Sequence, residues 1–82
     1  MSPRAERDLD RLPTSEARRI AGAIRRLAGD PRPRGVRKLR GIAPPLWRLR
    51  VGTFRVVYSI SDRARLVVVS RVVWRSEDTY GT

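Results

Sequence analysis

The 82-residue sequence contains no cysteine and no histidine. Without cysteine there is no disulfide and no thiolate nucleophile, and without both residues the usual zinc ligands are missing. The commonest general base near neutral pH is absent as well. Any catalysis must therefore use Arg, Lys, Tyr, Ser, Thr or a carboxylate, and we expect neither a metal nor another cofactor.

Long apolar segments are also absent. Residues 1–13 lack the apolar core of a secretory signal, and no segment approaches the ~20 apolar residues of a membrane span. We therefore expect a cytoplasmic protein with no membrane partner. At this length we expect one small domain over residues 1–82, in which folding buries only about 60% of the surface of the unfolded chain.

Acidic residues are few beside the basic ones. The sequence has 8 Asp and Glu against 19 Lys and Arg, a net charge of +11. Such a charge favours a polyanion, because binding to nucleic acid releases counterions. An acidic protein or an anionic membrane would also satisfy it.

Apolar spacing predicts two helices in the first third of the chain. Ser2, followed by proline, suits the N-cap of a helix over residues 3–12. A second helix is predicted over residues 15–28, where apolar residues recur at steps of three and four. Thr14 or Ser15 would be its N-cap. We expect the two to form a helical hairpin whose apolar stripe packs on a sheet.

The connection over residues 30–45 is rich in Pro, Gly, Arg and Lys, which predicts a basic loop. In one interpretation its basic side chains follow a phosphate backbone. In the other, the loop is a solvated linker. The residues concerned are Arg34, Arg37, Lys38 and Arg40.

Three antiparallel strands are predicted after this loop, at residues 46–51, 54–60 and 65–73, before a polar tail over residues 74–82. Apolar and basic residues alternate in the first strand, the period-two pattern of a half-buried strand. Gly52 and the threonine after it suit a two-residue type II′ turn, since glycine tolerates the positive φ of its first position.

This turn determines which side chains share a face of the sheet. If Val51 pairs with Phe54, then Arg55 lies beside Arg48 and Arg50 on one face, here called the arginine face, and the apolar residues lie on the other. Like charges directly across a strand pair are destabilising. Three arginines on one face therefore indicate an anionic ligand or partner, and the alternative is a solvated polar face.

The third strand is predicted to follow a turn around residues 61–64, so that Ile60 pairs with Arg65 and Arg55 lies opposite Ser70. Both of its faces are then substantially apolar. A central strand buried on both sides would explain this, and so would a partner protein over part of the arginine face. The apolar residues expected on the arginine face are Leu66, Val68 and Val72.

Three motifs occur in this order: KLRG at residues 38–41, LWRLRVGTFRVVYSI at residues 46–60 and WRSEDTY at residues 74–80. Together with the two helices, they resemble the RelE/ParE superfamily of type II toxins over nearly the whole chain. The resemblance implies an α+β fold, with an N-terminal helical hairpin packed on a small twisted antiparallel β-sheet. It also implies a cognate acidic antitoxin protein in a hetero-oligomeric toxin–antitoxin complex.

The motifs are closest to the RelE-like branch, which cleaves messenger RNA in the ribosomal A site. In that branch the RNA's own 2′-hydroxyl attacks, so the enzyme supplies neither a nucleophile nor a metal. The resemblance thus implies a ribosome-dependent mRNA endoribonuclease that inhibits translation. The residues that match the family's basic hairpin, the arginine after its aromatic and its closing tyrosine are Arg48, Arg50, Arg55 and Tyr80.

Guanidinium groups suit this chemistry because they bind phosphoryl oxygens bidentately. We expect Arg55 to be the main transition-state clamp, with Arg48 or Arg75 near the leaving 5′-oxygen. Tyr80 would stack on a splayed base or transfer a proton, unless it is an exposed tail residue. The predicted catalytic residues are Arg48, Arg55, Arg75 and Tyr80, and the predicted RNA-binding residues are Arg34, Arg37, Lys38, Arg40 and Arg50.

Two features depart from the family pattern. The family's first strand precedes its first helix, whereas here the helix begins almost at Met1; either the native chain begins upstream or the sheet lacks this strand and exposes an edge. The basic residue expected six positions before the closing tyrosine is Trp74, with Arg75 one place later, and one step along a strand reverses the face. Two other functions therefore stay open: a ParE-like inhibitor of DNA gyrase, and a degenerate, non-toxic basic binding module.

Overall fold

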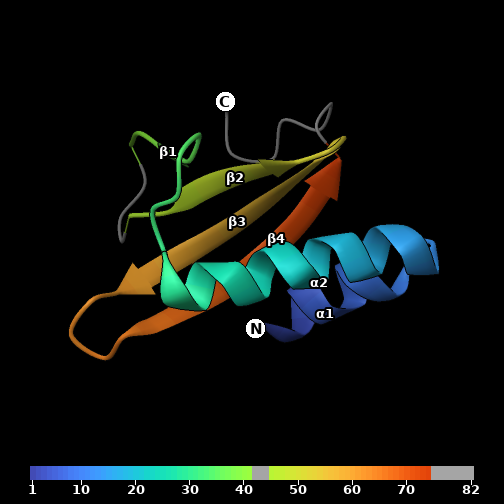
Figure 1. Cartoon of the computed structure of the whole chain (residues 1–82), viewed down its shortest axis with the longest axis horizontal. Coiled ribbons are helices and arrows are strands. Elements are labelled where there is room, and N and C mark those ends of the chain that lie inside the picture. The colour runs from blue at the N-terminus through green and yellow to red at the C-terminus, as the bar shows by residue number, and fades with distance from the viewer. Residues whose placement is uncertain (42–44, 75–82) are drawn as a thin grey trace.

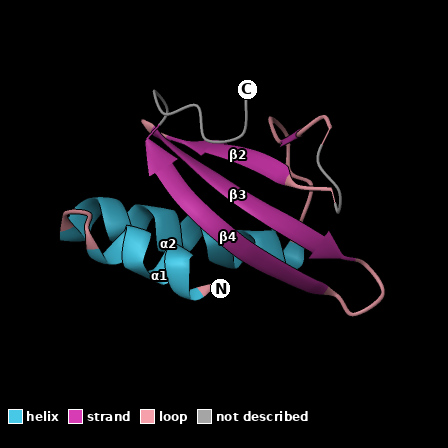
Figure 2. Ribbon diagram, turned by 180° about the vertical axis from the view of Figure 1, so that it is seen from behind, coloured by secondary structure: helices cyan, strands magenta, loops and turns pink. Residues whose placement is uncertain are grey.

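The computed structural model describes residues 1–41 and 45–74. Within these residues the chain forms two helices followed by four strands (Figure 1). In order they are α1 (Pro3–Asp10), α2 (Thr14–Gly29), β1 (Arg37–Lys38), β2 (Trp47–Val51), β3 (Phe54–Ser61) and β4 (Leu66–Trp74). The strands form one antiparallel sheet in the order β1-β2-β3-β4. Both helices lie on the same side of this sheet (Figure 2), which confirms the predicted α+β class.

The helices begin for different local reasons. Ser2 caps α1 as predicted, since its Oγ accepts a hydrogen bond from the Ala5 N–H at 3.1 Å. The N-cap of α2 is Pro13, which makes no side-chain capping bond, so the predicted role of Thr14 or Ser15 is wrong. The proline ring already holds φ near −56°, and its carbonyl accepts the first helical hydrogen bond, from the Ala17 N–H at 2.9 Å.

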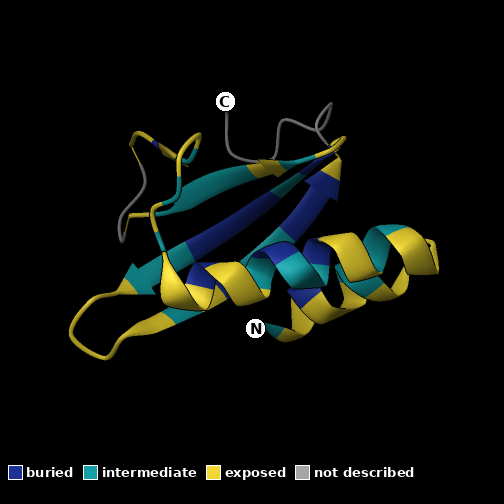
Figure 3. Cartoon of the chain, viewed as in Figure 1, coloured by how far each residue is buried: buried dark blue, intermediate teal, exposed yellow. Residues whose placement is uncertain are grey.

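The core lies between the helices and the two long strands. Figure 3 shows buried stretches in β3 and β4 and on the helix sides that face them. Each buried aliphatic or aromatic side chain of this size contributes about 1.5–3 kcal/mol relative to exposure. The most completely buried large residues are Tyr58, Phe54, Ile20, Leu27, Val56 and Val69. None of the described helices combines the length and apolarity that a bilayer crossing requires.

The predicted β2–β3 hairpin is confirmed. Val51 pairs with Phe54 and Arg50 pairs with Arg55. Gly52 has a φ of 59° and the next residue has no positive φ, which is the combination a type II′ turn requires. The face assignment of the hairpin therefore follows the sequence pattern.

The predicted β3–β4 register is wrong. The strands close at Ser61 and Leu66, with Arg65 in the left-handed region at φ 52°, so the turn lies later than expected and the register moves by two residues. A β-bulge then adds Ser70, whose neighbours in β4 pair with consecutive β3 residues. Such an extra residue reverses the alternation beyond it.

The bulge corrects the list of apolar residues on the arginine face. Leu66 and Val68, which precede it, lie on that face as predicted. Val72 pairs with Val56 and belongs to the helix-covered face, contrary to the prediction. The residue opposite Arg55 is Val73, not Ser70.

The connection predicted as a loop over residues 30–45 contains a short strand. In β1, Arg37 pairs with Arg48 and Lys38 pairs with Trp47, and the Leu39 N–H donates to the Leu46 carbonyl at 2.8 Å. Leu39 is buried. Two residues are too short to give an alternating pattern, which is why the sequence gives no sign of this strand.

β4 forms one edge of the sheet, and α1 supplies partners to part of it. The Ser2 N–H donates to the Val69 carbonyl at 2.8 Å, and the Ser2 Oγ donates to the Ser70 carbonyl at 3.0 Å. Asp8 accepts from the Val72 N–H at 2.9 Å. The sequence led us to expect an exposed sheet edge. The edge of β4 is instead covered near the bulge at Ser70, while Leu66, at the other end of the same strand, is 54% exposed.

Candidate functional site

Four arginines lie together on the face of the sheet that the helices leave uncovered. Two cross-strand pairs place them there: Arg37 opposite Arg48, and Arg50 opposite Arg55. Directly opposed residues of an antiparallel pair share a face, with Cβ atoms about 5 Å apart. We call these four residues the arginine cluster. The sequence predicted three of them on this face, and β1 adds Arg37.

The cluster is electrostatically strained in the free protein. Burial lowers the pKa of Arg48 below its ordinary value, because it removes water from the charged guanidinium. The positive charges of Arg55, Arg37 and Arg50, in that order, lower the Arg48 pKa further. All three belong to the cluster. An anion bound here would relieve both effects, so the cluster is suited to a phosphate or a carboxylate.

The four residues of the arginine cluster differ in how far they are buried. Arg37 and Arg50 are exposed, whereas Arg48 and Arg55 are half-buried. The Nε atom of Arg55 has no solvent exposure, and Val73 opposite it is buried on the same face. The backbone and packing therefore hold Arg55 in place before any ligand arrives, and the two outer arginines are free to follow a longer polyanion.

The other residues predicted to bind RNA lie apart from the cluster. Arg34 and Arg40 are exposed on either side of β1. Lys38 pairs with Trp47, and its Nζ lies 6.0 Å from the centroid of that ring, so Lys38 is on the opposite face from the cluster. The predicted catalytic residues Arg75 and Tyr80 are outside the described residues.

Trp74 occupies the position where the family pattern has a basic residue. It pairs with Phe54, and the two ring centroids are 4.5 Å apart. Phe54 belongs to the core on the helix side, whereas the preceding residue, Val73, lies opposite Arg55. Position 74 therefore points away from the arginine cluster, and a basic side chain there would not join it.

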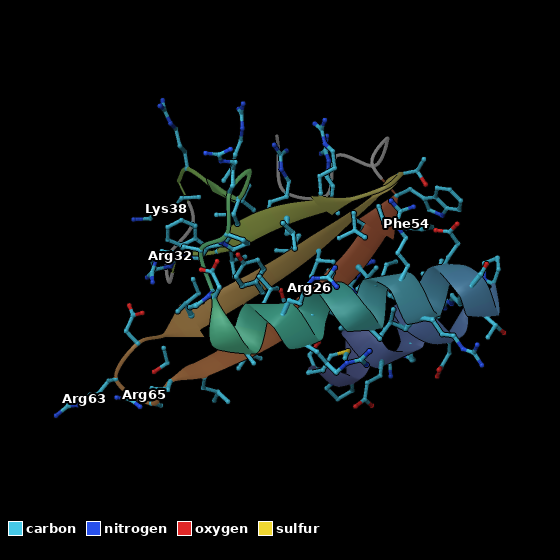
Figure 4. All side chains as sticks on the ribbon, in the orientation of Figure 1. Arg26, Arg32, Lys38, Phe54, Arg63 and Arg65 are labelled. Atoms are coloured by element: carbon cyan, nitrogen blue, oxygen red, sulfur yellow. The ribbon has the colours of Figure 1, made fainter. Side chains whose placement is uncertain are left out.

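Sequence reasoning missed Arg32. Its guanidinium forms two hydrogen bonds with the Asp62 carboxylate, both 2.9 Å long, and lies 5.0 Å from the centroid of the Trp47 ring. The ion pair holds the pKa of Asp62 below its usual value. Figure 4 shows Arg32 beside Lys38, at one end of the sheet. The ion pair joins residues 30 positions apart and the ring contact joins different elements, so no local pattern marks either of them.

No group of three metal-ligating side chains occurs within residues 1–41 and 45–74. What the described residues bring together is a cationic sheet face with two half-buried arginines, Arg48 and Arg55, between two exposed ones. Its ordinary chemistry is to bind anionic oxygens and to stabilise negative charge that develops on them.

A small α+β domain with a cationic sheet face is the class that the fold and cluster define. The family model for the ParE toxin of type II toxin-antitoxin systems, parDE, matches residues 1–79. The chain therefore belongs to the ParE toxin family, within the RelE/ParE superfamily that its motifs resemble, and it is a toxin of a type II toxin–antitoxin system.

The structure is also similar to a chain in the crystal structure of the archaeal RelE–RelB complex from Pyrococcus horikoshii OT3. The TM-score is 0.76 and the sequence identity is 28%, over 89% of this chain and 88% of that chain. A comparison with curated proteins gave no match. The family model is named for the ParE branch and the structural neighbour for the RelE branch. Together they establish the RelE/ParE superfamily for this chain.

Proposed function

We propose that this toxin is a ribosome-dependent mRNA endoribonuclease that inhibits translation. The arginine cluster carries the proposal: two cross-strand pairs place four guanidinium groups on the sheet face opposite the helices, and the other three lower the pKa of Arg48. An RNA phosphate entering the cluster would replace this repulsion with charge-assisted hydrogen bonds. The structural likeness to a chain of the RelE–RelB complex supports the same branch.

In the proposed reaction the RNA 2′-hydroxyl oxygen attacks the adjacent phosphorus. The P–O5′ bond breaks, a 2′,3′-cyclic phosphate forms, the 2′-proton passes to a base or water, and the departing 5′-oxygen gains a proton. Arg55, half-buried and held by packing, would clamp the phosphoryl oxygens as negative charge develops on them. Arg48, the other half-buried member of the cluster, is assigned to the leaving 5′-oxygen, where its guanidinium would stabilise the developing negative charge.

The exposed members of the cluster have a different role in this scheme. Arg37 and Arg50 would bind the phosphates on either side of the scissile bond. We also keep Arg75 and Tyr80 as proposed catalytic residues, on the resemblance of the closing motif. The proposed partners are messenger RNA, the ribosome and an acidic antitoxin, all in the cytoplasm.

Primer extension on a defined message in a reconstituted translation reaction tests the activity. We expect cuts at A-site codons with the native chain and none with Arg55→Ala. Arg34→Ala is the matched control, because Arg34 is an exposed arginine outside the cluster. It should keep the cuts and only weaken binding. Equal losses from both variants would indicate diffuse electrostatic binding in place of a specific site.

Inhibition of DNA gyrase is the second candidate, and the match to the ParE toxin family model favours it. The cluster would then bind DNA phosphates or acidic residues of gyrase, with no bond cleaved by the toxin. Gyrase stalled on DNA, without RNA cleavage, would support this function. Folded protein inactive in both assays would support a non-toxic basic binding module.

A further inference from the structure

A hollow of about 200 Å³ lies at the hairpin end of the sheet, between the end of α1 and the last residues of β4. Leu12 and the rings of Phe54 and Trp74 give it an apolar lining, and Arg11 lines it as well. Figure 4 shows Phe54 at this end of the sheet, away from Arg32. No residue of the arginine cluster is among the described residues that line the hollow.

Trp74 is the aromatic residue of this hollow that stays open to solvent. It is 51% exposed, whereas Phe54, its partner across the strands, is 2% exposed. The two ring centroids are 4.5 Å apart, so the buried ring supports the indole from the core side. The other tryptophan, Trp47, already has the Arg32 guanidinium 5.0 Å from its ring centroid. Trp74 is therefore the better placed of the two to stack on a ligand.

The polar groups of the hollow favour an anion beside that exposed ring. Asp8 is its one acidic residue among the described lining residues, and this carboxylate already accepts from the Arg71 Nε and the Val72 N–H. Arg11, by contrast, is exposed at the C-cap of α1. An aromatic ring for a base, with a cation for a phosphate, is how many proteins bind single-stranded nucleic acid.

The hollow adjoins the arginine cluster across the end of the sheet. Phe54 directly precedes Arg55, and Val73, which lies opposite Arg55, directly precedes Trp74. Adjacent residues of a strand point to opposite faces and are about 3.3 Å apart along it. The pair of Phe54 and Trp74 is also the last that β3 and β4 form at this end. An RNA with one phosphate on the cluster therefore reaches Trp74 by passing around the end of the sheet.

We propose that Trp74 and Arg11 form a subsite for one unpaired base of RNA and its phosphate. The base stacks on the exposed side of the indole, and the phosphate pairs with the guanidinium of Arg11. The inference rests on the nuclease function proposed above, which makes RNA the ligand. At about 200 Å³ the hollow is smaller than the roughly 300–1,000 Å³ of most small-molecule sites, so it suits a single base and not a whole cofactor.

Tryptophan fluorescence tests the stacking. The chain has two tryptophans, so in Trp47→Phe the indole of Trp74 is the only reporter. A short single-stranded 2′-O-methyl oligoadenylate should quench its emission, because a base in contact with the indole quenches it. An abasic oligomer with the same number of phosphates should leave the emission nearly unchanged. Equal quenching by both oligomers, or quenching by neither, would overturn the subsite.

Affinity measurements on Trp74 variants separate stacking from packing. Trp74→Leu keeps an apolar cover over Phe54 but loses the aromatic face, so it should bind the oligoadenylate at least about fivefold more weakly and the abasic oligomer about equally well. Trp74→Phe should restore most of the affinity. Leu66→Ala is the matched control, because Leu66 is an exposed apolar residue of β4 that does not line the hollow. Equal losses for both oligomers would mean that Trp74 acts only through the fold.

The role of Arg11 has its own test. Arg11→Gln should weaken both oligomers equally and should reduce the slope of log affinity against log salt by about 1, because it removes one phosphate contact. Arg25→Gln is the control, since Arg25 is an exposed arginine of α2 that does not line the hollow. The same change of slope in both variants would indicate diffuse attraction and would overturn the role of Arg11.

The two proposals fail separately, because oligomer binding is measured without ribosomes. A native chain that stacks the base but cuts no message would refute the nuclease proposal and leave the subsite standing. A chain that cuts message, and whose Trp74→Leu variant binds the oligoadenylate as tightly as the native chain, would refute the subsite alone. Quenching of Trp74 by the purified antitoxin, with none from RNA, would overturn the proposed occupant.

Discussion

Asp8 of α1 and Arg71 of β4 form an ion pair that is largely shielded from solvent. The Asp8 Oδ2 atom accepts from the Arg71 Nε at 2.8 Å and from the Val72 N–H at 2.9 Å. The side chains of Asp8 and Arg71 are only 10% and 14% exposed. One carboxylate therefore binds both a largely shielded charge and an edge amide, and it fixes the first helix to a strand 63 positions away.

We predict that Asp8→Ala lowers the free energy of unfolding by about 2 kcal/mol, within the range for loss of a hydrogen bond to a charged group. The substitution removes the Asp8 carboxylate from beside Arg71 and the acceptor from the Val72 N–H. Urea denaturation measures the change. Asp10→Ala is the control, since Asp10 is exposed on the same helix, and it should stay within about 0.5 kcal/mol. Equal effects would show that Asp8 matters only through helix charge.

Stability should fall at alkaline pH because of Tyr58. Burial raises the pKa of this phenol to about 12 from an ordinary 10.0, and its hydroxyl donates to the Pro31 carbonyl at 2.7 Å. Above pH 10 the unfolded chain loses this proton while the folded chain keeps it. The contribution is therefore complete below pH 10 and is lost as the pH rises to 12.

Urea denaturation at pH 9 and pH 11 tests this titration. The free energy of unfolding of the native chain should decrease more between these values than that of Tyr58→Phe. At pH 9 the variant should be less stable by about 1 kcal/mol, the net value of one hydrogen bond. The same decrease in both proteins would assign the alkaline effect to other groups.

Repulsion within the arginine cluster should lower the free energy of unfolding, while the same charges favour RNA binding. Arg50→Gln removes one of two directly opposed charges, so it should raise the free energy of unfolding by about 0.2–1 kcal/mol and weaken RNA binding. Added salt should stabilise the native chain more than this variant. Arg63→Gln, in the exposed β3–β4 turn, should change neither stability nor affinity appreciably. A destabilised Arg50→Gln would contradict the repulsion.

Gly52→Ala should destabilise the hairpin by about 1–2 kcal/mol. Gly52 has a φ of 59°, and an added Cβ would also press on the Arg19 guanidinium at 3.0 Å. Gly29→Ala, at the end of α2, meets no atom within 4 Å and should be neutral or slightly stabilising. Thermal unfolding of both variants measures the difference, and equal midpoints would mean that the turn tolerates alanine.

Local patterns were enough for the elements that short-range physics controls. Helical spacing located α1 and α2, and the glycine turn between Val51 and Phe54 set the β2–β3 register. That register in turn placed three arginines on one face. Each of these features depends on residues within one helix or one hairpin. Within such a segment, neighbouring residue types determine the periodicity and the turn geometry.

Local sequence patterns could not predict the β3–β4 register. It depends on Arg65 taking a positive φ and on the bulge at Ser70, whose Oγ donates to the Val57 carbonyl at 3.1 Å while its own carbonyl accepts from Ser2. An arginine does not indicate a positive φ, and a serine does not indicate a bulge. The free energy that favours these conformations comes from packing and from hydrogen bonds to other segments. One extra residue was enough to move Val72 to the opposite face.

The sequence by itself determined that the protein is a basic, cysteine-free and histidine-free domain with two helices and an arginine-bearing hairpin. Only the tertiary structure decided that Arg37 joins the cluster through β1, that Lys38 does not, and that Asp8 holds Arg71. The physical reason is distance along the chain. Contacts between residues tens of positions apart leave no period in the sequence, and their free energy is realised only when the folded core brings them together.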